Sequence, residues 1–181
     1  MKSKLILSLA ALLTISGYLM LNSCSKLKSI TLHKTYADIE FVIPAPKTAG
    51  TFEIEKDIQA DLQDLASQNG FDINKIESAT INSISLQIAD TTLPSYTFAI
   101  VDNAVCSFSA DGVSVSEVGS DDAVHTSPTQ IDFDLKGIDV TPYLKASSYK
   151  AKIKLTTNAD ITHDVPMKAS IQCSFKVTPF K

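Results

Sequence analysis

The chain has 181 residues, of which 44% are hydrophobic, and its 16 lysines and 20 acidic residues give a formal net charge of −4. It contains no arginine and no tryptophan. Arginine is the side chain best suited to grip phosphate, so its absence and the negative net charge predict that the protein does not bind nucleic acid.

The first 24 residues have the organisation of a secretory signal. Lys2 and Lys4 precede an uncharged apolar run over residues 5–20, and small polar residues then lead to Cys24. The sequence Leu21-Asn22-Ser23-Cys24 resembles the lipobox of bacterial lipoproteins, in which the cysteine is diacylated, the preceding peptide is removed and the new N-terminus is acylated. We therefore predict a cleaved signal peptide over residues 1–23 and lipidation of Cys24. Two alternatives are a transmembrane helix, for which the run is shorter than the roughly 20 residues required, and an ordinary signal peptide with a chance cysteine.

Cleavage before Cys24 would leave 158 residues with fourteen lysines against twenty acidic residues, a net charge of −6. That length suits one domain with one core. We predict a lipidated tether over residues 24–36 and a single domain over residues 37–181, although Ile30 to Leu32 could instead form an edge strand. Lys26 and Lys28 would lie against lipid head groups. Surface-exposed lipoproteins often carry an acidic run there, so the basic run favours an outer-membrane location facing the periplasm.

Alternating apolar residues predict strands in the first half of the domain. A strand over 37–43 ends at Pro44 and Pro46, and a second strand from Phe52 could pair back on it. One amphipathic helix is predicted over 57–68 from Ile58, Leu62, Leu65 and Ala66, which recur at helical spacing, with Asn69-Gly70 as its stop.

The second half alternates more regularly. The strand over 76–88 changes parity near Asn82-Ser83, which predicts either a bulge or a switch between sheets. Asp111-Gly112 is a strong turn signal, and 119–128 reads as a polar loop. A short helical turn is predicted to open with Thr141 as its cap and Pro142 at the first helical position. The other predicted strands cover 96–108, 113–118, 131–135, 149–156 and 165–180. Together these elements predict a mainly β fold, a seven- to eight-stranded antiparallel β-sandwich of immunoglobulin-like type with one short amphipathic helix.

Cys106 and Cys173 both fall on the apolar face of a predicted strand. Outside the inner membrane two such thiols could form a disulfide. They could equally remain buried free cysteines that pack as small apolar residues, because a shared core does not bring two Cα atoms within bridging distance.

The sequence predicts no catalytic, cofactor or metal site. His33, His125 and His163 lack metal-ligand spacing, and the acidic pairs 121–122, 132/134 and 160/164 lack the pattern of a calcium loop. No serine lies in a hydrolase motif, and neither core cysteine has a basic neighbour that would lower its thiol pKa. We therefore expect a protein that is not an enzyme.

The lipobox, the stretch 57–88 and the segment 139–144 together resemble a group of small bacterial lipoproteins with one immunoglobulin-like or late-embryogenesis-abundant-like β-sandwich. The resemblance implies the sandwich fold and lipidation at Cys24, and it implies no activity. The function predicted is a lipid-anchored module that binds another envelope protein. The alternatives are a periplasmic carrier of an apolar ligand or lipid, and a fibre or adhesin subunit in which residues 30–43 serve as a donor strand.

Overall fold

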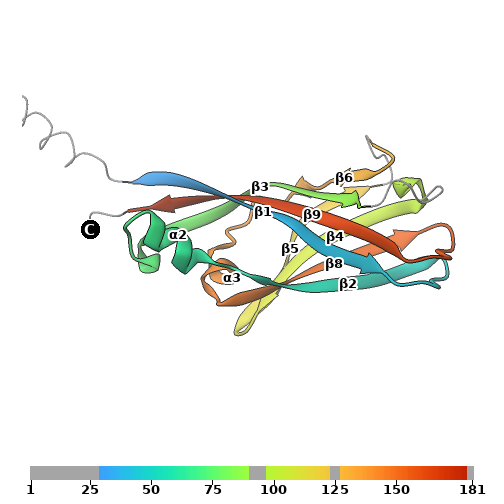
Figure 1. The fold of residues 1–181 in the computed structure, drawn as a ribbon, viewed down its shortest axis with the longest axis horizontal. Helices are drawn as coiled ribbons and strands as arrows, with labels where there is room; N and C mark the ends of the chain where they lie inside the picture. The colour runs from blue at the N-terminus through green and yellow to red at the C-terminus, as the bar shows by residue number, and fades with distance from the viewer. Residues whose placement is uncertain (1–28, 90–96, 123–126, 179–181) are drawn as a thin grey trace, which may run out of the picture.

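The computed structural model describes residues 29–89, 97–122 and 127–178. Two antiparallel sheets pack face to face, as Figure 1 shows. The four-stranded sheet has the order β1 (Ile30–Ile43), β9 (Val165–Val177), β3 (Ile76–Ile88), β6 (Gln130–Asp132). The five-stranded sheet has the order β2 (Gly50–Gln59), β8 (Ser148–Thr157), β4 (Val101–Ala110), β5 (Val113–Asp122), β7 (Asp134–Leu135). The predicted mainly β, antiparallel sandwich is confirmed.

One apolar core fills the space between the sheets, because the strands alternate as their sequences predict. On β8 the apolar residues from Tyr149 to Leu155 are buried and the lysines between them face outward. On β9 every odd-numbered residue from Val165 to Val177 is buried. A fully buried Leu, Ile, Phe or Met side chain contributes about 1.5–3 kcal/mol relative to exposure. β8 in one sheet and β9 in the other therefore supply much of the protein's stability.

The chain joins the four-stranded sheet earlier than the tether prediction allows. β1 begins at Ile30, which pairs with Val177 of β9, and the pairing continues to Tyr36. The tether boundary at residue 36 is therefore wrong: the edge strand that the sequence allows over Ile30 to Leu32 is present and extends beyond it through Tyr36. A bulge between Tyr36 and Ile39 then shifts the register, with Asp38 at φ 53.

The predicted helix over 57–68 begins too early. Residues 57–59 belong to β2, and the helix α2 spans Leu62–Gln68. Ile58 fits the helical spacing, but it also continues the strand parity of Ile54, and pairing with β8 decides between the two periods. The predicted stop is confirmed: Gly70 has φ 70, and the Phe71 N–H bonds the Ala66 carbonyl at 3.1 Å.

The expected pairing of the first two strands is also wrong. β2 lies in the other sheet and pairs with β8, from Gly50 opposite Thr157 to Gln59 opposite Ser148. In β3 the predicted parity change is a bulge, since the register with β9 shifts between Ile81 and Ser83 while the strand stays in one sheet. β3 follows a short 3-10 turn, η1 (Ile73–Lys75).

A second 3-10 turn, η2 (Phe98–Ile100), occupies the beginning of the strand predicted over 96–108, and β4 follows it; residue 96 itself lies outside the described residues. Asp111-Gly112 forms the predicted turn between β4 and β5. β5 continues to Asp122, so the predicted loop over 119–128 is wrong for its first four residues, and residues 123–126 lie outside the described part.

The predicted strand over 131–135 is divided between the sheets: β6 pairs with β3, and β7 pairs with β5. The helix α3 (Thr141–Lys145) then buries Tyr143 and Leu144, as predicted. The carboxylate of Asp139, rather than Thr141 itself, caps this turn: it accepts hydrogen bonds from the backbone N–H of Thr141 at 2.9 Å and of Ala79 at 3.2 Å. None of the described helices is long and apolar enough to cross a membrane.

Candidate functional site

Cys24 lies outside the described residues, so its lipidation stays a prediction. The described chain enters the fold at residue 29, at the end of the sandwich that carries α2 (Figure 1).

Cys106 on β4 and Cys173 on β9 are both buried and free. The disulfide that the sequence leaves open is not formed, and the buried-thiol alternative describes both residues. Burial raises the pKa of each thiol to about 12. A thiol that stays protonated at neutral pH is a poor nucleophile and a poor metal ligand, so this pair packs the core.

His33 lies among neutral polar side chains. His33 Nδ1 lies 2.9 Å from Ser174 Oγ, which also accepts a hydrogen bond from Asn82 Nδ2 at 2.6 Å, on the solvent face of the four-stranded sheet. In the described part of the chain, no carboxylate is hydrogen-bonded to His33. His163 Nδ1 contacts Thr162 Oγ1 at 3.0 Å, and His125 falls outside the description.

The acidic pair 160/164 accepts hydrogen bonds from backbone N–H groups. Asp160 accepts a hydrogen bond from the Ala49 N–H at 2.7 Å, and Asp164 accepts one from the Ala45 N–H at 2.8 Å. Both therefore hold the connection between β1 and β2 in place. Within residues 29–89, 97–122 and 127–178, no group of three His, Cys, Asp or Glu side chains could hold a metal ion.

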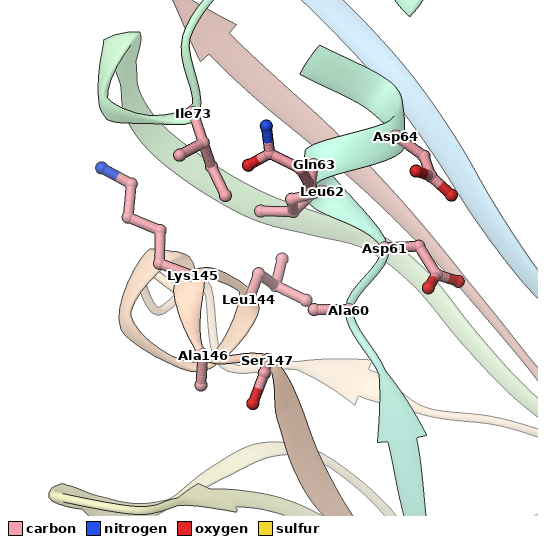
Figure 2. A pocket seen from close by; sticks show the side chains of 10 residues that line it. All are labelled: Ala60, Asp61, Leu62, Gln63, Asp64, Ile73, Leu144, Lys145, Ala146 and Ser147. Carbon is pink, nitrogen blue, oxygen red and sulfur yellow. The ribbon is translucent and has the colours of Figure 1, made fainter. Parts of the chain in front are cut away.

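A pocket of about 370 Å³ lies where α2 meets α3. Figure 2 shows Leu62, Ile73 and Leu144 converging on its apolar floor, while the carboxylates of Asp61 and Asp64 point away. Lys145 flanks the pocket, but its Nζ donates to the Ile76 carbonyl at 2.9 Å. The pocket therefore combines a small apolar floor with polar and charged residues around it, and it is not an enclosed apolar cavity.

A larger groove of about 460 Å³ runs between β1 and β2. Residues 34–40 form one wall, and residues 56–59 with Asp61 form the other. Its lining combines the half-buried Ile39 and the buried Ile58 with charged side chains. At one end, Lys34 Nζ donates to the Asp61 carbonyl at 3.2 Å and lies 4.9 Å from the centre of the Tyr36 ring.

Both walls of this groove are edge strands. β1 pairs with β9 alone and β2 with β8 alone among the described residues, and no backbone hydrogen bond to another described segment covers their outer edges. Unpaired edges of this length are templates for another strand. The groove and its two edges are the candidate functional site.

Charges are arranged in two rows on the outer face of the five-stranded sheet. Three acidic residues of β2 lie opposite three lysines of β8: Glu53 and Lys154, Glu55 and Lys152, Asp57 and Lys150. The ion pairs run diagonally, with Lys150 Nζ 2.8 Å from Glu55 Oε1 and Lys152 Nζ 2.9 Å from Glu53 Oε2. The hydrogen bond from Lys150 lowers the pKa of Glu55, and the same bond raises the pKa of Lys150.

Reasoning from the sequence missed this acidic row, because residues 57–59 were assigned to a helix. The signal is present in the sequence: Glu53, Glu55 and Asp57 share one parity, and Phe52, Ile54 and Ile58 share the other. That β2 lies at an edge has no local signal, since it depends on which strands pair.

No family model matches the sequence, and no curated protein matches it. Among solved structures, the infectious bursal disease virus Gt strain chain is 11% identical with a TM-score of 0.38, over 83% of this chain and 33% of that one. Turnip yellow mosaic virus is 13% identical with a TM-score of 0.30, covering 84% and 96%. The decameric BFDV capsid protein is 11% identical with a TM-score of 0.38, covering 81% and 99%. This chain thus spans about a third of the first of these, and at such identities and TM-scores the similarities carry no information on function.

Proposed function

We propose that this protein is a lipid-anchored, non-enzymatic module of the bacterial cell envelope that binds another envelope protein. The observation that carries the proposal is the pair of edge strands, β1 and β2, on either side of one groove, whose outer edges pair with no described segment. The free main-chain groups of an edge strand can form a ladder with an extended segment of a partner, and a neighbouring groove can take the partner's side chains.

The anchoring half of the proposal rests on the sequence that ends at Cys24. Each buried CH₂ group of an acyl chain contributes about 0.8 kcal/mol to membrane attachment, so two or three chains would hold the protein in the bilayer. Surface-exposed lipoproteins often carry an acidic run after the cysteine, so by resemblance the basic residues Lys26 and Lys28 favour an outer-membrane protein with its domain in the periplasm. The role needs no cofactor, metal or nucleic acid.

The two alternatives receive less support. A lipid carrier needs an enclosed apolar cavity, whereas the groove and the pocket described above are lined in part by charged side chains. A fibre subunit needs a removable donor strand, whereas β1 is paired with β9 almost throughout its length.

Fractionation of cells tests the anchor. Cys24→Ser is expected to move the protein from the membrane to the soluble fraction, and Ser25→Ala, the neighbouring control, is expected to leave it in the membrane. Persistence of the Cys24→Ser protein in the membrane would show that the anchor is not the acylated cysteine.

Site-specific photo-crosslinking in the native envelope tests the docking. A photoreactive residue in place of Glu40 on β1 or Lys56 on β2 is expected to capture one reproducible envelope protein. The same residue in place of Gln172, on the outer face of the four-stranded sheet, is expected to capture none. Only self-adducts, or only lipid, would contradict docking and favour the fibre subunit or the carrier respectively.

A further inference from the structure

We infer that β2 is the strand that accepts the partner, and that the partner segment is an extended one in which basic and apolar residues alternate. This inference rests on the proposed function and names the chemistry of its partner.

β2 is the better template of the two edges. Its register with β8 runs over ten residues without a shift. The register of β1 is broken between Tyr36 and Ile39, and Asp38, in the left-handed region at φ 53, turns its carboxylate to Lys168 Nζ at 2.9 Å. A bulge of this kind interrupts strand addition, so the longer continuous ladder can form along β2.

The outer face of β2 determines the charge of the partner. Neighbouring strands place their side chains on the same face of a sheet, opposite one another. A strand added to the free edge would therefore lie opposite Glu53, Glu55 and Asp57. β8 pairs with the other edge of β2, and it places a lysine opposite each of these three acidic residues. Lysine or arginine at alternate positions of the added strand is the matching arrangement.

A second copy of β2 does not fit this edge. In an antiparallel pair centred on Glu55, that residue would lie opposite its own copy, and Glu53 would lie opposite Asp57. Like charges directly opposite one another on a sheet are destabilising. The acidic row thus disfavours self-pairing while it favours a basic strand, and the occupant is a different sequence.

The inner face of the added strand would meet the groove between β1 and β2. The buried Ile58 and the half-buried Ile39 contribute the apolar part of that groove. Apolar side chains at the positions between the basic ones would cover these two residues. The exposed Lys56 lies on the same side of β2, next to Ile58 in the groove lining. β8 itself has the same pattern, with Lys150, Lys152 and Lys154 outward and apolar residues inward.

The β8 sequence is therefore a suitable probe. A fluorescent peptide, Ser-Tyr-Lys-Ala-Lys-Ile-Lys-Leu-Thr-Thr, is titrated with the purified full chain in detergent, and the anisotropy is followed. We expect saturable binding that weakens as salt is added. The same peptide with glutamate in place of its three lysines is expected not to bind.

Variants locate the binding edge. Glu53→Lys with Glu55→Lys is expected to raise the peptide's dissociation constant about tenfold, since two cross-strand attractions become repulsions. The neutral double variant Glu53→Gln with Glu55→Gln should raise the dissociation constant by a smaller factor. Circular dichroism of each variant shows whether it is folded. Glu40→Lys tests the other edge, β1. Glu117→Lys on β5, which is exposed and lies outside the groove, is the matched control, with an expected change below about twofold.

Absence of peptide binding would overturn the inference, as would equal binding of the glutamate peptide. A loss caused by Glu40→Lys alone would assign the edge to β1 and also overturn it. These failures are separate from failure of the proposed function: an envelope protein captured at Glu40 and not at Lys56 would leave docking standing and remove β2 as the acceptor. Capture of nothing at either position would remove the docking role itself.

Discussion

Replacement of Tyr149 by phenylalanine is expected to stabilise the protein. Tyr149 lies in the core on β8, 1% exposed, with its ring centre 4.8 Å from that of Phe108. Its hydroxyl is buried and has no hydrogen-bond partner among the described residues. The ring packs well, but the hydroxyl loses its hydrogen bonds to water on folding and gains none from the protein.

The magnitude follows from that missing bond. A buried polar group without a partner costs about 1–3 kcal/mol, and Tyr149→Phe removes the group while keeping the ring. Allowing for the small gap that remains, we expect a gain of about 1 kcal/mol in the free energy of unfolding, or about 2–4 °C in Tm for a chain of this size. Tyr36 is the matched control, because its hydroxyl donates to the Ala60 carbonyl at 2.5 Å. Tyr36→Phe should therefore lose about 1 kcal/mol.

Urea unfolding followed by far-ultraviolet circular dichroism measures both effects. The chain has no tryptophan, and tyrosine fluorescence would change with the substitutions themselves. The midpoints should shift in opposite directions with unchanged slopes. If Tyr149→Phe lowered the midpoint as Tyr36→Phe does, the Tyr149 hydroxyl would have to be satisfied, for instance by a buried water, and the reasoning would be refuted.

Two further predictions concern the core thiols and the α3 cap. In a Cys24→Ser background, Cys106 and Cys173 should both resist a maleimide in the folded protein, because burial holds their thiol pKa at about 12, and both should react in urea without reductant; failure to react in urea would indicate a disulfide. Asp139→Asn keeps an acceptor oxygen and removes the charge, so it should cost about 1 kcal/mol of stability at neutral pH, measured by urea unfolding. Burial raises the pKa of Asp139, but hydrogen bonds from Thr141 and Ala79 and the charge of Lys145 outweigh it and leave the pKa below its usual range. The carboxylate's contribution should therefore be complete above an unfolded pKa of about 3.9 and vanish as the pH falls through the folded value; a wild-type advantage that persisted under strong acid would contradict this.

The candidate site shows where local patterns stop being informative. Ile58 satisfies both a helical and a strand period, and the sequence offers no local reason to choose. β8 makes the choice by pairing with β2 as far as Gln59. The same pairing turns Glu53, Glu55 and Asp57 into one row, so the acidic edge is visible only after the sheet is assembled.

The sequence by itself determined the features that depend on near neighbours. The inward parity of β8 and β9, the parity change near Ser83 and the Gly70 stop of α2 follow from side-chain alternation and backbone preference within a few residues. The paired structure decided that the parity change is a bulge and not a switch between sheets. Tertiary structure decided which strands are neighbours, because burial of the whole apolar face selects the pairing. It therefore placed β1 and β2 in different sheets, left both at edges and formed the groove between them.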